Sequence, residues 1–190
     1  MTTRIDLAPG LSIPFFPMRP WTGRTVHDPG SVQRLWSEII GGEWHAQPKL
    51  NGDRSLLAVH DGRVLVANRR GSWFKHPVAN ASEFKQLPNG TVLDGEVYDR
   101  MFLPFEALAV GTEVLLNESP LQRELAARQC VKFLGHVWWF FKPTLKWLLG
   151  LRNNNPTWEG VVLKKSTSTY QPLGTEGQES QEWKKCKWQA

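Results

Sequence analysis

Residues 47–55, with the sequence QPKLNGDRS, restrict the fold of this chain more than any other stretch. A strand-like apolar run follows them. The Asn51-Gly52 dipeptide is the strongest two-residue signal for a β-hairpin, because both central positions of such a turn must tolerate positive φ. We therefore predict a hairpin whose turn fixes the directions of Lys49 and Arg54. Both side chains would project from one end of the hairpin into a shared space.

A lysine held in this way is suited to nucleophilic attack on phosphorus. An amine attacks only when it has lost its proton, and desolvation and neighbouring cations favour that form. The alternative is an ordinary surface hairpin with two solvated cations. The short pattern Lys-x-Asn-Gly-x-Arg does not distinguish the two interpretations by itself, so the rest of the chain has to decide between them.

The composition excludes several classes of protein. The 190 residues can form one substantial core, and no apolar run is long enough to cross a bilayer. The first residues lack the apolar core of a secretory signal, and two cysteines are too few for a disulfide framework or a zinc site. We expect a protein that is not secreted and acts in the cytoplasm, a nucleoid or a viral replication site. The net charge of +5 is consistent with a polyanionic partner.

The pattern of apolar residues predicts more strands than helices. We expect residues 1–30, which are rich in Pro and Gly, to form an arm packed on a domain of residues 31–190. Ser31 is expected to cap a helix that extends to residue 40, and residues 120–134 are expected to form an amphipathic helix. In that second helix Leu121, Leu125, Arg128 and Val131 are spaced by three or four residues, which would bring them to one face. Strands are predicted at 43–49, 55–61, 63–68, 91–98, 102–110, 137–141, 159–165 and 183–188.

A basic loop follows one of these strands. Residues 68–77, NRRGSWFKHP, contain Arg69, Arg70 and Lys75 among aromatic side chains. Cations and aromatic groups on a loop are suited to contacts with a nucleic-acid backbone. A solvated loop is the alternative interpretation.

Charged residues also lie within the predicted strands. Glu96 lies in an otherwise apolar strand, where a carboxylate is costly unless it is paired or faces a ligand cleft; a strand at the edge of a sheet, facing water, is the alternative. The charged positions that could line one cleft are Lys49, Arg54, Glu96, Glu159, Lys185 and Lys187.

This set of residues matches the needs of nucleotidyl transfer. An amine attacks an α-phosphate, cations offset the charge of the transition state, and a carboxylate holds a divalent metal. Magnesium requires few protein ligands, because it keeps its waters and takes phosphate oxygens. Glu159 is the candidate metal ligand.

From about residue 44 to residue 188 the sequence resembles the covalent nucleotidyltransferases, namely ATP-dependent DNA ligases, RNA ligases and messenger-RNA capping enzymes. The resemblance implies an α+β fold of mainly antiparallel sheets flanked by helices, the ATP-grasp-like adenylation domain. Six segments occur in the order of the family's motifs: KLNGDR at 49–54, NRRGSWFKHP at 68–77, VLDGEVY at 92–98, PFEALAVGTEVLLNESPLQRE at 104–124, EGVVLKK at 159–165 and EWKKCKW at 182–188. Asn51 and Glu106 stand where the family more often has Asp.

The resemblance also implies individual roles. Lys49 would form the phosphoramide with AMP, Glu159 would bind the metal, and Arg69 would contact the 5′-phosphate of a nick. Independently of the resemblance, the cations of the basic loop, Arg70 and Lys75 included, would help to grip DNA. The nucleotide would be bound by Gln47 at adenine, Phe105 against the base, Glu96 at the ribose, Lys185 and Lys187 at the α-phosphate, and Arg54.

Within the family, the segments resemble DNA ligases most. An arginine at the end of the first motif, and the 104–124 segment, are more typical of DNA ligases than of RNA ligases. The implied enzyme uses ATP and Mg²⁺ or Mn²⁺ to seal nicked duplex DNA in repair, replication or recombination. An RNA ligase, a GTP-using capping-type enzyme and a non-catalytic nucleic-acid-binding module are the alternatives.

DNA ligases normally continue after the last of these motifs into an OB-fold domain, whereas this sequence ends two residues after Trp188. We therefore expect a monomeric minimal ligase without a C-terminal OB-fold domain. The alternative is a chain that works with a separate OB-fold or clamp protein.

Overall fold

The computed structural model describes residues 5–8, 11–13, 20–26, 29–69, 74, 76–134, 144–146, 148–149, 158–171 and 179–188. The strand predicted at 137–141 and the predicted DNA-binding residues Arg70 and Lys75 lie outside this part of the chain. Among the described residues, none of the helices combines the length and the apolar character needed to cross a membrane.

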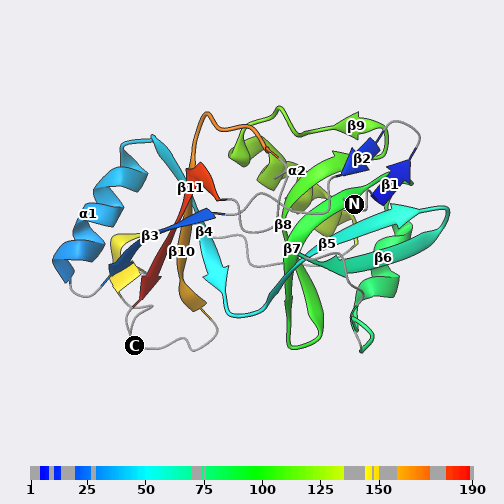
Figure 1. Ribbon diagram of the computed structural model, residues 1–190, viewed down its shortest axis with the longest axis horizontal. Coiled ribbons are helices and arrows are strands. Elements are labelled where there is room, and N and C mark those ends of the chain that lie inside the picture. Colours follow the sequence, from blue (N-terminus) through cyan, green and yellow to red (C-terminus); the bar gives the residue numbers. More distant parts are fainter. Residues whose placement is uncertain are drawn as a thin grey trace.

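Two sheets form the body of the molecule, and in Figure 1 they lie side by side. The four-stranded sheet has the order β3 (Pro20–Val26), β11 (Ser180–Trp188), β10 (Trp158–Lys165) and β4 (Trp44–Leu50). The five-stranded sheet has the order β6 (Arg63–Asn68), β5 (Asp53–His60), β7 (Val92–Tyr98), β8 (Met101–Val110) and β9 (Glu113–Val114).

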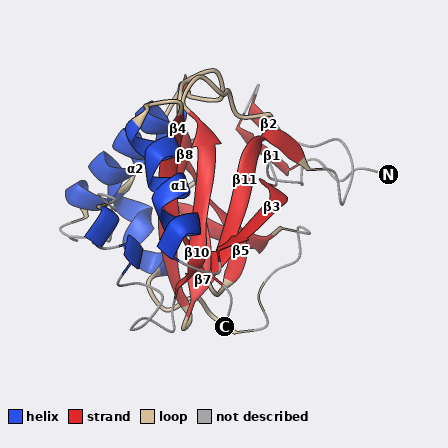
Figure 2. Ribbon diagram, turned by 90° about the vertical axis from the view of Figure 1, so that its left-hand side faces the viewer, coloured by secondary structure: helices blue, strands red, loops and turns tan. Residues whose placement is uncertain are grey.

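Both sheets are mainly antiparallel: among the strands that the structure describes, only β3 and β11 pair in parallel. A separate pair is formed by β1 (Ile5–Ala8) and β2 (Leu11–Ile13). The helices whose bounds the structure gives are α1 (Pro29–Ile40), α2 (Pro120–Phe133) and the 3₁₀-helix η1 (Ala81–Gln86). Figure 2 shows α1 and α2 on one side of the strands. The predicted α+β class is confirmed. Part of the predicted N-terminal arm, β3, is a strand of the four-stranded sheet.

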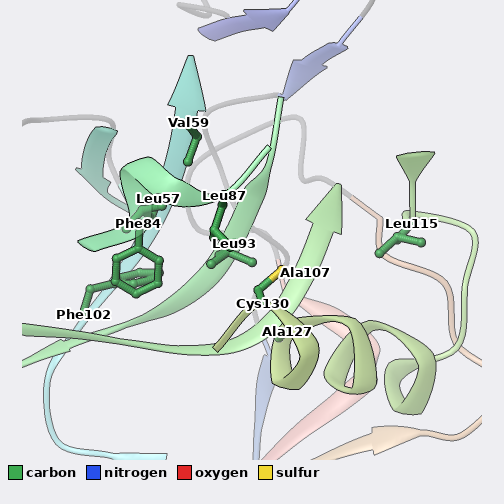
Figure 3. Close-up of a cluster of buried hydrophobic side chains, with 10 residues drawn as sticks. All are labelled: Leu57, Val59, Phe84, Leu87, Leu93, Phe102, Ala107, Leu115, Ala127 and Cys130. Atoms are coloured by element: carbon green, nitrogen blue, oxygen red, sulfur yellow. The ribbon is translucent and has the colours of Figure 1, made fainter. Parts of the chain in front are cut away.

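Three buried clusters hold these layers together. Val32 and Leu35 of α1 pack on the four-stranded sheet, and Ala127 and Cys130 of α2 pack on the five-stranded sheet. Figure 3 shows the second of these clusters, where the rings of Phe84 and Phe102 meet edge to face. A third cluster lies between the two sheets and contains Leu56, Ala58, Val92, Leu108, Ala109, Tyr170 and Trp183.

The helices differ from the prediction in their details. Helix α1 begins at Pro29, so Ser31 lies inside the helix and does not cap it. In α2 the predicted apolar positions are wrong for Leu121 and Leu125, which are 50% and 40% exposed, whereas Val131 is buried. The buried face contains Arg123 and Glu124, and such burial is tolerated because each has partners of opposite charge.

The predicted hairpin at Asn51-Gly52 is also wrong. Strand β4 belongs to the four-stranded sheet and β5 to the five-stranded sheet, so the dipeptide links the two sheets. Gly52 is required there for another reason: a β-carbon would lie 2.5 Å from the carbonyl oxygen of Val97 and 2.8 Å from Cγ of Glu96. The second predicted hairpin turn, Asp61-Gly62, is confirmed between β5 and β6.

Gly160 controls the packing at the centre of the four-stranded sheet. It pairs with Lys49 of β4 on one side and Lys187 of β11 on the other, and its φ is +149°. A β-carbon at this position would lie 2.0 Å from the carbonyl oxygen of Cys186. The close approach of β10 and β11 therefore depends on glycine.

We expect Gly160→Ala to lower the free energy of unfolding by about 2 to 4 kcal/mol, through the clash and the disfavoured φ together. Urea denaturation measures this change. Gly62→Ala is the matched control, because its φ is +68° but no atom lies within 4 Å of the added carbon. Its cost should be only about 1 kcal/mol. Equal losses in the two variants would contradict the assigned role of the close approach.

Candidate active site

Three strands bring two lysines to one carboxylate. Lys49 of β4 forms an ion pair with Oε2 of Glu159 on β10, and Nζ of Lys187 on β11 lies 3.2 Å from the same oxygen. Partial burial opposes ionisation of Glu159, but the hydrogen bonds and charges of Lys49 and then Lys187 lower its pKa. The cluster is half-buried, since the exposed fractions are 19% for the Lys49 side chain and 28% for that of Glu159.

A second ion pair stands on the facing sheet. Nε of Arg54 donates to Oδ1 of Asp94 over 3.0 Å, and the hydroxyl of Tyr170 donates to Oδ2 over 2.8 Å. Burial opposes the charge of Arg54, but Asp94 raises the pKa of the guanidinium well above its ordinary value. Arg54 is therefore a fixed cation in the space between the sheets.

Two aromatic rings accompany these cations. The guanidinium of Arg54 lies 5.3 Å from the ring centroid of Phe105 and 5.4 Å from that of Trp183. Nζ of Lys164 lies 3.9 Å from the Trp183 centroid and 4.9 Å from the Phe105 centroid. These are cation–π distances. Phe105 and Trp183 come from different sheets, so the rings help to define the space between them.

A buried acid, Glu106, holds Lys164 in place. Glu106 is fully buried and accepts from Nε of Arg123 over 3.0 Å and from Nζ of Lys164. Burial opposes ionisation of Glu106, but Lys164 and Arg123 lower its pKa. Burial also lowers the pKa of Lys164 to about 8, against the charge of Glu106.

Glu96 occupies the edge of the same space. It pairs in register with Arg54 across β5 and β7, and the backbone N–H of Gly52 bonds to it. Burial raises the pKa of Glu96 to about 7, in spite of the opposing charges of Arg54 and Lys49. A carboxyl group of this kind can gain or lose a proton near neutral pH, and it can form a hydrogen bond with a hydroxyl group.

Gln47 lies two residues before Lys49, on the same face of β4. Its Nε2 donates to Oε2 of Glu124 over 2.9 Å and to the backbone carbonyl of Phe105 over 3.2 Å. Gln47 is therefore tied to Phe105, while Lys49 and Lys187 meet at Glu159.

The remaining predicted residues are Lys185, whose side chain is 15% exposed, and Arg69. Lys185 alternates with Trp183 and Lys187 along β11, and its Nζ lies 3.6 Å from Glu179. Arg69 is exposed, and its backbone N–H donates to the carbonyl of Arg54 over 2.9 Å. The roles assigned to all these residues stay predictions.

Sequence reasoning missed the residues that hold the site in place. They are His45, Asp94, Arg123, Glu124, Lys164, Tyr170 and Trp183, which anchor or flank the predicted residues. Two of them carried a usable signal: Asp94 is a second acid in an apolar strand, and Lys164 is a lysine at the end of another. The others become visible only through contacts between distant elements.

Comparisons with known proteins identify the fold. A mycobacterial DNA ligase D complexed with ATP and MES is 21% identical over 90% of this chain and 60% of that chain, with a TM-score of 0.62. The ligase domain of M. tuberculosis LigD is 21% identical over 90% of this chain and 59% of that chain, with a TM-score of 0.67. A third structure, Pmar-Lig_Pre, is 20% identical over 87% of this chain and 46% of that one, with a TM-score of 0.58.

The chain thus has the fold of ligase nucleotidyltransferase domains and spans about three fifths of the two ligase D chains. No protein-family model matches the sequence, and no curated protein matches it either.

The raised pKa of Glu96 predicts a dependence of stability on pH. Between the ordinary value of 4.5 and about 7, the unfolded chain releases this proton while the folded chain retains it. The free energy of unfolding should therefore fall as pH rises through this window, and remain lower above it. In Glu96→Gln the part of the pH dependence that comes from this carboxyl group is absent. Relative to the variant, the native protein should lose about 2 kcal/mol between about pH 5 and about pH 8, measured by urea denaturation. Identical pH profiles would contradict the prediction.

Proposed function

We propose that this chain is the adenylation domain of an ATP-dependent polynucleotide ligase that seals 5′-phosphate/3′-hydroxyl nicks in duplex DNA. The observation that carries the proposal is the convergence of Lys49 and Lys187 on one carboxylate oxygen of Glu159. Lys49, Glu159 and Lys187 come from three strands. Covalent nucleotidyl transfer requires an amine as nucleophile, together with charged groups beside it that stabilise the transition state. The shared fold of ligase domains supports the same conclusion.

Glu159 fits a divalent metal in spite of being a single carboxylate. Within the described residues there is no group of three or more His, Cys, Asp or Glu side chains that could hold an ion. Mg²⁺ or Mn²⁺ takes one carboxylate together with waters and phosphate oxygens, so Glu159 is sufficient. The ion would supply neutralisation of charge on the phosphates of ATP.

Lys49 is the proposed nucleophile. Its Nζ attacks the α-phosphorus of ATP, a P–N bond forms, the bond from the α-phosphorus to the bridging oxygen breaks, and pyrophosphate leaves. Glu159 holds the ammonium of Lys49 in the structure, so Nζ must give up a proton, to this carboxylate or to water, as the ion pair opens and before it attacks. Lys187 and Lys185 would neutralise the oxygens of the α-phosphate.

The remaining nucleotide contacts are those that the resemblance to the covalent nucleotidyltransferases implies. Phe105 would stack on the base, while Glu96 would contact the ribose hydroxyls beside Arg54. In the second step the AMP moves to a 5′-phosphate of the nick, and in the third a 3′-hydroxyl displaces it. Arg69, at the end of β6, would contact that 5′-phosphate.

The first experiment incubates the protein with ATP and Mg²⁺ and measures the intact mass. We expect a gain of one AMP, because the amine of Lys49 is the only group proposed to accept it. Lys49→Ala should abolish the gain, whereas Lys85→Ala, an exposed lysine on η1, should leave it intact. A gain with GTP alone would favour the capping-type alternative, and no gain with either nucleotide would refute the proposed chemistry.

A second experiment tests the contact with DNA. Charge reversal to Glu at Arg69, Arg70 and Lys75 should weaken binding to a nicked duplex by about tenfold or more at low salt, because each cation lost removes a phosphate contact. Fluorescence anisotropy measures the affinity. Charge reversal of Lys85 is the control. Unchanged affinity would exclude the loop as the DNA contact, and an equal preference for nicked RNA would favour the RNA-ligase alternative.

A further inference from the structure

We propose that Glu124 is a positioning residue that locks the Gln47 side chain with its carbonyl oxygen toward the nucleotide, so that the site selects a 6-aminopurine over a 6-oxopurine. This inference rests on the proposed function, because it takes the space beside Phe105 and Lys49 as the nucleotide site. It adds the origin of the base preference, which lies in a helix outside the strands that carry the chemistry.

The orientation of the Gln47 amide follows from its two neighbours. Nε2 lies 2.9 Å from Oε2 of Glu124 and 3.2 Å from the carbonyl oxygen of Phe105. A carboxylate and a backbone carbonyl only accept hydrogen bonds, so both require the nitrogen of the amide on their side. Burial opposes ionisation of Glu124, but His45, Gln47 and Arg128 lower its pKa, which keeps it an acceptor.

Glu124 is itself held at both oxygens. Nε of Arg128 donates to Oε1 over 3.0 Å, and Nε2 of His45 lies 2.6 Å from Oε2, the oxygen that also accepts from Gln47. The residue is 3% exposed. With one oxygen bound by a guanidinium and the other by an imidazole and an amide, the carboxylate cannot rotate without losing partners.

The carbonyl oxygen of Gln47 is left for a ligand. In the described part of the chain no group donates to Oε1 of Gln47. The side-chain atoms there that are both buried and without a hydrogen-bond partner are Nδ1 of His60, Nη2 of Arg123, Oγ of Ser168 and Nε1 of Trp183. Oε1 is not one of these occluded atoms. An acceptor in this position can receive a hydrogen bond from a 6-amino group but repels a 6-oxo group.

Gln47 is also well placed along the strand. It lies two residues from Lys49 on the same face of β4, and its amide is tied to the backbone of Phe105, the proposed base platform. A base stacked on that ring, with its phosphate near Lys49, would therefore present an edge to Gln47.

The test compares ATP with inosine triphosphate, which carries a 6-oxo group and lacks the 6-amino group. Binding to the full chain is measured by titration calorimetry, so the readout does not depend on chemistry at Lys49. The native protein should bind ATP about tenfold more tightly than inosine triphosphate. ATP gains a hydrogen bond from its 6-amino group to Oε1 of Gln47, whereas the 6-oxo group of inosine triphosphate is repelled by that oxygen.

Glu124→Gln should bring this affinity ratio close to one. The new amide must keep its oxygen toward Arg128, which only donates, and so it turns its nitrogen toward Gln47. Nε2 of Gln47 then loses its acceptor, and the Gln47 amide is no longer held with its carbonyl oxygen toward the nucleotide. Glu113→Gln, the same change on the exposed strand β9, is the matched control and should keep the native ratio.

Several results would overturn the inference. A merely structural role for Glu124 would weaken the binding of both nucleotides equally and leave the ratio unchanged. If circular dichroism shows that Glu124→Gln is unfolded, Gln47→Met replaces it: it removes the acceptor and should lower affinity for ATP but not for inosine triphosphate. An unchanged ratio in Gln47→Met would also contradict the inference.

The two proposals fail in different ways. Selective binding of ATP without any AMP on the protein would refute the proposed function and leave the base preference standing. AMP transfer with no discrimination between the two nucleotides would refute the base preference alone. Failure to bind either nucleotide would refute both.

Discussion

The carboxylate of Glu159, shared by Lys49 and Lys187, is the interaction on which the proposed site depends. Three strands must approach one another closely for two ammonium groups to reach one oxygen, and the sheet achieves this at Gly160, where a side chain would strike the next strand. The contact is half-exposed and binds its cations through charge, so an anion or a metal can compete for the same partners. A phosphate group entering here would meet cations that already stand in position.

Buried acids give the surrounding residues their fixed positions. Asp94 holds Arg54, Glu106 holds Lys164 and Arg123, and Glu124 holds Gln47. Each carboxylate is completely or almost completely buried and has at least two partners, which offset the cost of removing its charge from water. The groups that would touch a nucleotide are therefore preorganised by a layer of acids behind them. The same layer joins α2 and the five-stranded sheet to the four-stranded sheet.

Much of the fold could be predicted from local pattern, because the signals were local. The apolar runs on either side of the Asp61-Gly62 turn predict the β5–β6 hairpin correctly. The same reasoning failed at Asn51-Gly52, since the dipeptide does not show that its flanking strands belong to different sheets. It failed again on α2, because a helix face that buries Arg123 and Glu124 has no apolar periodicity.

The candidate site shows the same division. The lysines and acids at strand ends, such as Lys49, Glu159 and Lys187, could be singled out because charges in strands demand an explanation. Their supporting residues could not, since the contact between Glu124 and Gln47 spans 77 positions and that between Tyr170 and Asp94 spans 76. Tyr170 lies in a segment that is poor in apolar residues, yet its side chain is 3% exposed and packs on Trp183.

The central claim is that one amine, that of Lys49, carries the nucleotide. Peptide mapping by tandem mass spectrometry, after the native protein has reacted with ATP and a divalent metal, locates the adduct directly. The account predicts AMP attached through a phosphoramide to the peptide that contains Lys49, and to that residue within it. AMP found on Lys185, Lys187 or any other residue, with Lys49 unmodified, would contradict it.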